Sequence, residues 1–111
     1  MKGKYKAAFI IPAGAEKVLG EDGWEFESSS RLSLGVKEHL IDALELKFQE
    51  SYLGIDSYIE GNVKMSVFYD DESQIESIHF QLYEDALAVL SEVCQAGGIA
   101  NEAELFIPPQ G

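Results

Sequence analysis

Two segments in the second half of the chain alternate apolar and polar residues, and this alternation limits the fold more than any other feature. A period of two places successive side chains on opposite faces of an extended strand. The polar link 70–73 between the segments therefore predicts an antiparallel β-hairpin. The positions expected on one face are apolar: Val63, Met65, Val67, Tyr69, Ile78, Phe80 and Leu82. The positions expected on the other face are mostly polar: Asn62, Lys64, Ser66, Phe68, Ser77, His79 and Gln81.

One helix is expected before this hairpin in the sequence and one after it. Apolar residues recur about every four positions from Val36 to Phe48, and Ser33 can cap the start, so a helix is predicted within 33–51. A second run of helical spacing, opened by two acidic residues, predicts a helix within 84–97. The change of apolar period at these borders separates the helices from the hairpin strands.

Three further strands are predicted outside this central part. Segment 4–11 contains β-forming residues and is largely apolar after Ala7, which is typical of a central strand. Segment 24–27 alternates aromatic and acidic residues and predicts a short extra strand, which pairs with the first strand or runs along an edge. Residues 16–23 are expected to form a loop, and 104–107 the last strand before two prolines.

Without the extra strand, the order of elements is strand, helix, hairpin, helix and strand, which is the split βαβ arrangement of ferredoxin-like folds. A chain of 111 residues has the size of one domain. We therefore expect a single α+β domain over 1–111, a ferredoxin-like two-layer sandwich with two helices on one face of a mainly antiparallel sheet and an extra short strand. The residues expected in its core are Phe9, Ile11, Leu40, Leu44, Val67, Phe80, Leu90 and Cys94.

The charge of the chain indicates what it binds. Twenty Asp and Glu face eight Lys and Arg, giving a net charge of -12. Such a surface attracts basic proteins and repels nucleic acid. No apolar run approaches the roughly 20 residues of a membrane helix, and the stretch 7–11, interrupted by Pro12, is short for a signal peptide. Cys94 is the only cysteine, which fits a reducing cytoplasm. We expect a cytoplasmic protein with a basic protein partner and no membrane association.

Three residues that could carry chemistry have simpler interpretations. His39 lies near Glu38 and Asp42 at helical spacing, but these residues predict a solvated helix face rather than a metal site. His79 falls on the polar face of its strand, where acid–base catalysis would need a positioned partner and a cleft. Cys94 falls on the apolar side of the second helix and is interpreted as a small buried hydrophobe. We therefore expect no enzymatic activity, no cofactor and no metal.

In its length, acidity, scarcity of arginine and lack of a catalytic motif, the chain resembles the small acidic immunity proteins of bacterial toxin–immunity pairs. The resemblance implies a stoichiometric inhibitor of a nuclease toxin. The charge favours the same interpretation, because a nuclease is basic where it holds phosphates and an acidic protein can associate with it rapidly. The alternative is a small ferredoxin-like enzyme or ligand-binding protein, oligomeric through its open sheet face.

Acidic residues gather in two predicted turn-and-edge regions. Both regions are expected to project outward and to lack neighbouring Lys or Arg that would neutralise them. The hairpin tip 70–73 also lacks the spacing of an EF-hand calcium loop. We expect both regions to contribute to a partner-binding surface, whose residues are Asp70, Asp71, Glu72 and Glu76 together with Glu21, Asp22, Glu25 and Glu27.

Overall fold

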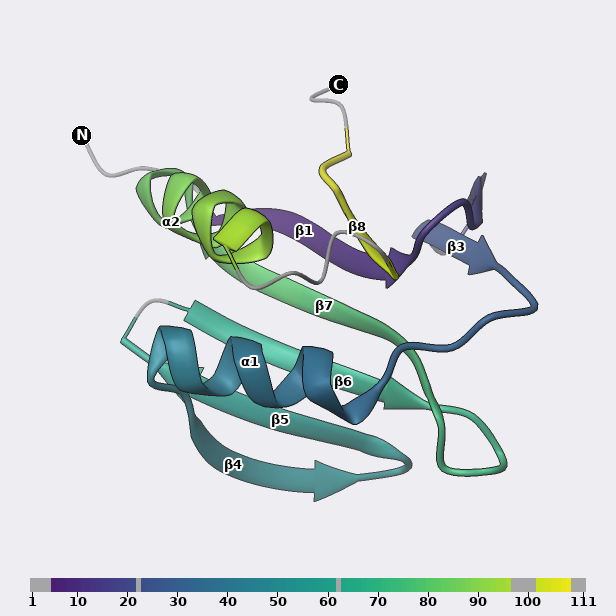
Figure 1. Ribbon diagram of the computed structural model, residues 1–111, viewed down its shortest axis with the longest axis horizontal. Coiled ribbons are helices and arrows are strands. Elements are labelled where there is room, and N and C mark those ends of the chain that lie inside the picture. Colours follow the sequence, from purple (N-terminus) through teal and green to yellow (C-terminus); the bar gives the residue numbers. More distant parts are fainter. Residues whose placement is uncertain (1–4, 22, 62, 97–101, 109–111) are drawn as a thin grey trace.

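A six-stranded sheet forms the centre of the computed structural model, which describes residues 5–21, 23–61, 63–96 and 102–108 (Figure 1). The strands of this sheet are β1 (Tyr5–Pro12), β4 (Lys47–Tyr52), β5 (Ile55–Glu60), β6 (Val63–Tyr69), β7 (Ile75–Tyr83) and β8 (Ala103–Phe106). They lie in the order β4-β5-β6-β7-β1-β8, and every neighbouring pair is antiparallel. The remaining elements are the strands β2 (Glu16–Gly20) and β3 (Gly23–Glu27), which form a separate sheet, and the helices α1 (Leu34–Leu44) and α2 (Glu84–Ala96). The expected α+β class with a mainly antiparallel sheet is confirmed.

The hairpin predicted from the alternating segments is formed by β6 and β7. Met65 lies opposite Phe80, and Val67 lies opposite Ile78, so the apolar positions of the two strands share one face. The turn is closed by the N–H of Asp70, which donates to the carbonyl oxygen of Gln74 at 2.8 Å. The second helix also follows its prediction, since α2 lies within the expected 84–97 range.

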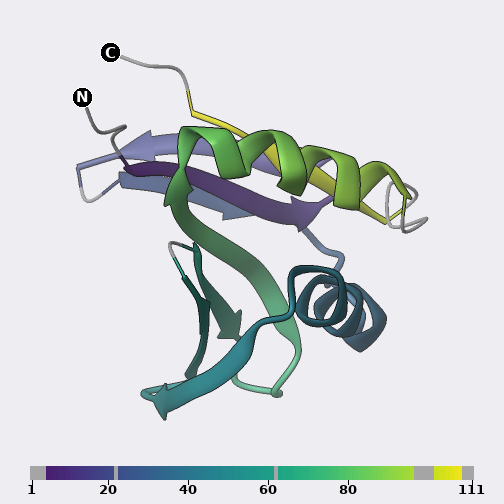
Figure 2. The same ribbon diagram turned by 90° about the vertical axis from the view of Figure 1, so that its left-hand side faces the viewer.

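Both helices pack on the same face of the sheet. Val36 and Leu40 of α1 and Leu90 of α2 belong to one buried cluster with the apolar positions of β1, β6 and β7. A hydrogen bond of 3.0 Å between Nε2 of His39 and the carbonyl oxygen of Val93 links the two helices. In Figure 2 the long strand β7 passes from the part of the sheet beneath α2 to the part beside α1. One core therefore joins both halves of the molecule.

Most residues expected in the core are buried. They are Ile11, Leu40, Val67, Phe80 and Leu90. The remaining three, Phe9, Leu44 and Cys94, are half-buried. Ile11 is fully buried but lies outside the cluster beneath the helices, so the opposite side of β1 is covered as well. No helix within the described ranges is long and apolar enough to cross a membrane.

The first helix is shorter than predicted. It ends at Leu44, and Glu45 then adopts a left-handed conformation with φ of 55°. The N–H of Leu46 donates to the carbonyl oxygen of Ile41 at 2.9 Å, a bond that closes the helix end. The helix therefore lies within the predicted range 33–51 but leaves its last part non-helical, because the backbone turns away before Phe48 can extend the apolar stripe.

Strand β4 takes the place of the expected helix end and forms one edge of the sheet. Phe48 pairs with Tyr58 of β5, and their ring centroids lie 5.6 Å apart. Leu53 and Gly54 both have positive φ, 52° and 77°, which is typical of the two-residue turn between antiparallel strands. The register shifts between Phe48 and Glu50, so this edge carries a β-bulge.

The extra strand is confirmed, but its pairing differs from the prediction. Residues 16–20, expected to form a loop, are β2, and β3 pairs with β2 rather than with β1 or along an edge. The ring centroid of Phe26 lies 5.0 Å from that of Phe9 of β1. The ring centroid of Trp24 lies 4.9 Å from that of Phe106 of β8. The β2–β3 hairpin therefore covers part of the sheet face that the helices leave open.

Candidate partner-binding surface

Arg31, the only arginine of the chain, links the segment after β3 to the acidic tip of the β6–β7 hairpin. Its Nε donates to Oδ2 of Asp70 at 2.9 Å, and its Nη2 lies 3.8 Å from Oε2 of Glu76. Its Nη1 donates to the carbonyl oxygens of Ser28 and Ser30, each at 3.0 Å. The segment that leads from β3 to α1 is thereby fixed against the β6–β7 hairpin.

Asp70 has a structural role in this arrangement. Its Oδ1 accepts the backbone N–H groups of Glu72 at 2.8 Å and Gln74 at 2.9 Å, while its Oδ2 accepts from Arg31. The hydrogen bond from Arg31 and those from the backbone lower the pKa of the Asp70 carboxyl. The expectation that the tip acids lack a basic neighbour is therefore wrong for Asp70 and Glu76. The sequence conceals this contact because Arg31 lies 39 residues before Asp70.

The other tip acids remain open to solvent. Asp71 and Glu72 are exposed, and neither side chain forms an ion pair with any described residue. Glu76 is half exposed and lies at the outer limit of ion-pair distance from Arg31. These three side chains are therefore available to a partner, whereas Asp70 is occupied.

The β2–β3 hairpin presents a second group of acids. Glu16 lies directly opposite Glu27, and Glu25 lies two positions further along the same face. All three are exposed, while Trp24 and Phe26 on the other face pack against the main sheet. Like charges directly opposite each other across two strands destabilise the pairing. The outer face of this hairpin is therefore acidic at a cost in stability.

One end of this hairpin meets the β6–β7 hairpin. Glu27 and Glu76 line a single hollow of about 240 Å³, together with Ser28 and Arg31. We call Glu27, Asp71, Glu72 and Glu76 the acidic edge. Glu25 and Glu21 do not line this hollow, although both are exposed. Asp22, the remaining predicted residue, lies outside the described residues.

The structure also identifies an acid that the sequence did not indicate. Glu102 lines a further hollow with Glu72 and Arg31, of about 530 Å³. Its Oε1 accepts the hydroxyl of Ser33 at 2.6 Å and the Ser33 N–H at 3.2 Å. Glu102 thus holds the start of α1 against the segment before β8. No local sequence pattern signals this contact, because 69 residues separate Ser33 from Glu102.

Of the other side chains considered for chemistry, His79 is more buried than expected, whereas Cys94, expected in the core, is half-buried. His79 is half-buried, and its ring centroid lies 4.1 Å from that of Phe68 and 4.6 Å from that of Phe9. Burial lowers the pKa of His79 to about 4, so its ring is neutral at pH 7. Burial also raises the pKa of the Cys94 thiol to about 11. Among the described residues, no group of three or more His, Cys, Asp or Glu is placed to hold a metal ion.

Comparisons of the chain with protein-family models, with curated proteins and with solved structures find no match.

Proposed function

We propose that this protein is an acidic binding protein that neutralises a basic protein partner. The observation that carries the proposal is the acidic edge, whose carboxylates are exposed while the nearby Arg31 is already paired with Asp70. Among the described basic side chains, only Lys17 and Lys47 are exposed, and each lies within 4 Å of a glutamate. Few cations therefore compete with a partner for these acids.

The partner that fits this surface best is a nuclease toxin domain. A nuclease needs a basic surface to hold phosphate groups, and an acidic protein can occupy that surface in place of nucleic acid. The resemblance to bacterial immunity proteins points to the same partner, and such a pair would meet in the cytoplasm. Binding would be stoichiometric, because inhibition here requires only that the basic surface is covered.

The ferredoxin-like interpretation of the fold belongs to the same proposal. Four neighbouring strands of the sheet lie in the order β8-β1-β7-β6. In the chain, α1 comes between β1 and β6, and α2 comes between β7 and β8, which supports a split βαβ core. In this interpretation, the β2–β3 and β4–β5 hairpins are insertions into that core. The acidic edge then combines one inserted hairpin, β2–β3, with the core hairpin β6–β7.

The proposal can be tested by charge reversal at the acidic edge. A basic partner would first be captured on the immobilised protein from a lysate of the source cell and identified. Its association would then be followed by surface plasmon resonance at low and near-physiological salt. We expect Asp71→Lys/Glu72→Lys to lower the on-rate about tenfold at low salt, because long-range attraction governs encounter. The effect should shrink as the Debye length falls to about 8 Å.

A matched control separates the edge from net charge alone. Glu38→Lys/Asp42→Lys makes the same change in net charge on the exposed side of α1. Equal losses of on-rate in the two variants would show that the acidic edge is not the binding surface. An on-rate indifferent to salt and to both reversals would identify the acidity as a solubility feature and remove the proposal.

A further inference from the structure

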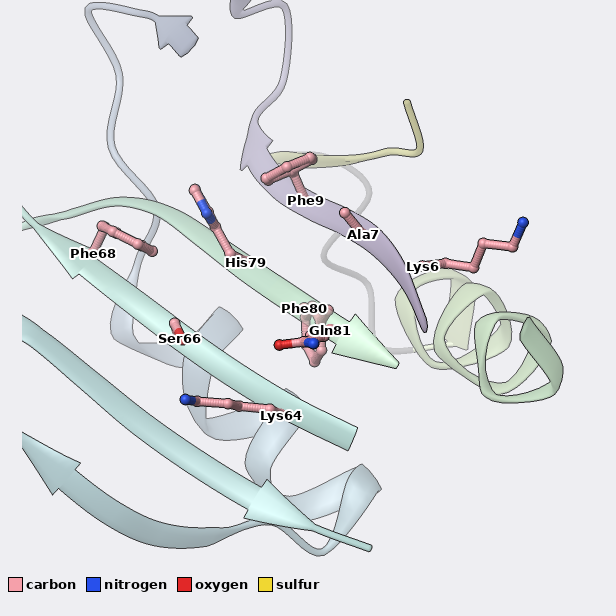
Figure 3. Close-up of a pocket in the computed structure, with 9 residues that line it drawn as sticks. All are labelled: Lys6, Ala7, Phe9, Lys64, Ser66, Phe68, His79, Phe80 and Gln81. Atoms are coloured by element: carbon pink, nitrogen blue, oxygen red, sulfur yellow. The ribbon is translucent and has the colours of Figure 1, made fainter. Parts of the chain in front are cut away.

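The sheet face away from the helices contains a hollow of about 440 Å³ (Figure 3). Its position follows from the register of three strands. Ala7 of β1 and Lys64 of β6 both lie opposite Gln81 of β7. In the next row, Phe9 and Ser66 lie opposite His79. The small side chains of Ala7 and Ser66 leave space between larger neighbours, and the resulting volume lies in the range of small-molecule sites.

The charge of this hollow is opposite to that of the molecule. Its lining residues are Lys6, Ala7, Phe9, Lys64, Ser66, Phe68, His79, Phe80 and Gln81. None of them is acidic, although the chain carries twenty Asp and Glu. Figure 3 shows Lys64 extended along β6 on the side of Ser66, while Lys6 is directed away from the other labelled side chains. Lys64 forms no ion pair with a described residue, so its charge is available to a ligand.

Hydrogen-bonding groups accompany this lysine. The amide of Gln81 lies directly opposite Lys64, and the hydroxyl of Ser66 lies in the next row. Gln81 is exposed and Ser66 is half-buried, so both groups can be reached from solvent. His79 uses Nε2 for the hydroxyl of Ser77 at 3.1 Å, which leaves its Nδ1 without a hydrogen bond to a described residue.

Aromatic rings form the apolar wall of the same hollow. Phe68 and Phe9 each contact the ring of His79, and the three side chains come from β6, β1 and β7. Phe26 of the β2–β3 hairpin packs behind Phe9, at 5.0 Å between ring centroids. This support holds the wall in place, because a flat ring fixed on two sides has little rotational freedom left.

We propose that this hollow binds a small organic anion with a flat apolar body, whose charged group is held by Lys64 and whose body lies against Phe9 and Phe68. A cation is disfavoured because no carboxylate lines the hollow. A single negative charge is favoured because the field of a protein with net charge -12 opposes multiply charged anions. This proposal does not depend on the acidic edge or on a protein partner.

The test uses two dyes that differ mainly in charge. 8-Anilinonaphthalene-1-sulfonate carries a sulfonate, and N-phenyl-1-naphthylamine has the same two ring systems without it. We expect the anionic dye to bind at one site per chain in a fluorescence titration. Lys64→Gln should weaken the anionic dye about tenfold, as expected for loss of a hydrogen bond from a charged group. The same substitution should change the neutral dye less than twofold.

Two further variants locate the site. Ala7→Leu, which fills the hollow, should abolish binding of both dyes, and Ser66→Val provides the same test from β6 if Ala7→Leu does not fold. Lys47→Gln, on the edge strand β4, removes one positive charge outside the lining and should leave both affinities unchanged. Each variant must keep the melting temperature of the parent, because the anionic dye also binds partly unfolded chains.

Three results would overturn the proposal: no saturable binding of the anionic dye, equal weakening by Lys47→Gln and Lys64→Gln, or binding retained in a folded Ala7→Leu or Ser66→Val variant. None of them would bear on the acidic edge, whose charge-reversal experiment uses a different surface and a different partner.

Discussion

The two faces of the six-stranded sheet are made by the same strands, yet they differ in what covers them. On the helix side, Met65, Val67 and Ile78 are completely buried beneath α1 and α2. On the opposite side, Lys64 and Ser66 alternate with Met65 and Val67 along β6 and remain partly open to solvent. The β2–β3 hairpin packs on the β1–β8 part of that face and reaches His79 of β7 through Phe26. One face is therefore specialised for stability, and the other has room for a ligand.

Buried positions accept few types of residue, whereas positions on an open sheet face accept many. Every side chain beneath the helices serves to exclude water, so an apolar residue at every second position is sufficient. The open face combines aromatic rings, hydroxyls, an imidazole and a lysine. Substitutions on the two faces should consequently have different effects on stability.

The largest expected difference lies within β7. Phe80→Ala removes a ring that is 3% exposed in the core, so we expect a loss of about 3–5 kcal/mol in the free energy of unfolding. Gln81→Ala, the next residue on the open face, should change that free energy by less than about 0.5 kcal/mol. Urea denaturation of both variants measures the contrast, and similar losses would mean that the two faces do not differ in this way.

The cover of the open face should be worth less than the core. Phe26→Ala removes the contacts of this half-buried ring with Phe9 and Phe106, and we expect a loss of about 2 kcal/mol. Val18→Ala, on the outer face of the same hairpin, is the control and should cost less than about 0.5 kcal/mol. If chemical denaturation showed the two variants to be equally stable, the hairpin would not be a packed cover.

The burial of His79 should appear as a pH dependence. The folded-state pKa of about 4 lies below the ordinary value of 6.5, so the unfolded chain binds a proton more readily. The stability contributed by neutral His79 should be complete above pH 6.5 and should fall as the pH drops toward 4. Between pH 7 and pH 5 we expect a loss of about 1–2 kcal/mol.

Carboxylates also titrate at low pH, so the His79 effect is defined by difference. Denaturation curves of the parent and His79→Gln would be compared at each pH, and the variant should lack the loss. His39→Gln, which alters the other histidine of the chain, should retain it. A parent and a His79→Gln variant with the same pH profile would place His79 in water rather than in the aromatic wall.

The smallest expected effect concerns the turn between β6 and β7, which contains Asp70. Asp70→Asn removes the charge that binds Arg31 while keeping a side-chain oxygen for the turn, and we expect a small drop in the melting temperature. Asp71→Asn, next in the turn and exposed, should have no measurable effect. Thermal unfolding of both variants would check this, and equal melting temperatures would show that the Arg31 contact adds no stability.

The elements that the sequence predicted are those in which apolar period and environment agree. The β6–β7 hairpin and α2 follow directly from their residue patterns. Strand β4 was missed because Phe48 continues the four-residue spacing of α1 by coincidence, although 60% of its surface is exposed. Strand β5 has no regular alternation of apolar and polar residues, so the sequence did not indicate it.

The candidate site was harder to predict than the fold because it depends on distant contacts. The exposure of Asp71 and Glu72 followed from their place in a turn. The neutralisation of Asp70 and Glu76 did not, because Arg31 reaches them only after the chain has folded. The burial of His79 was likewise hidden, since the aromatic neighbours Phe9 and Phe26 come from strands remote in sequence.

The bulge in β4 has a consequence for how the protein behaves at high concentration. An outermost strand offers unpaired amide groups to which another chain can add, and a bulge interrupts the regular spacing that such addition requires. Mutual repulsion between molecules of charge -12 gives a second protection. The two protections differ in their response to acid. Near pH 4.3, the isoelectric point that the sequence gives, the net charge approaches zero and the bulge is the remaining protection of the β4 edge.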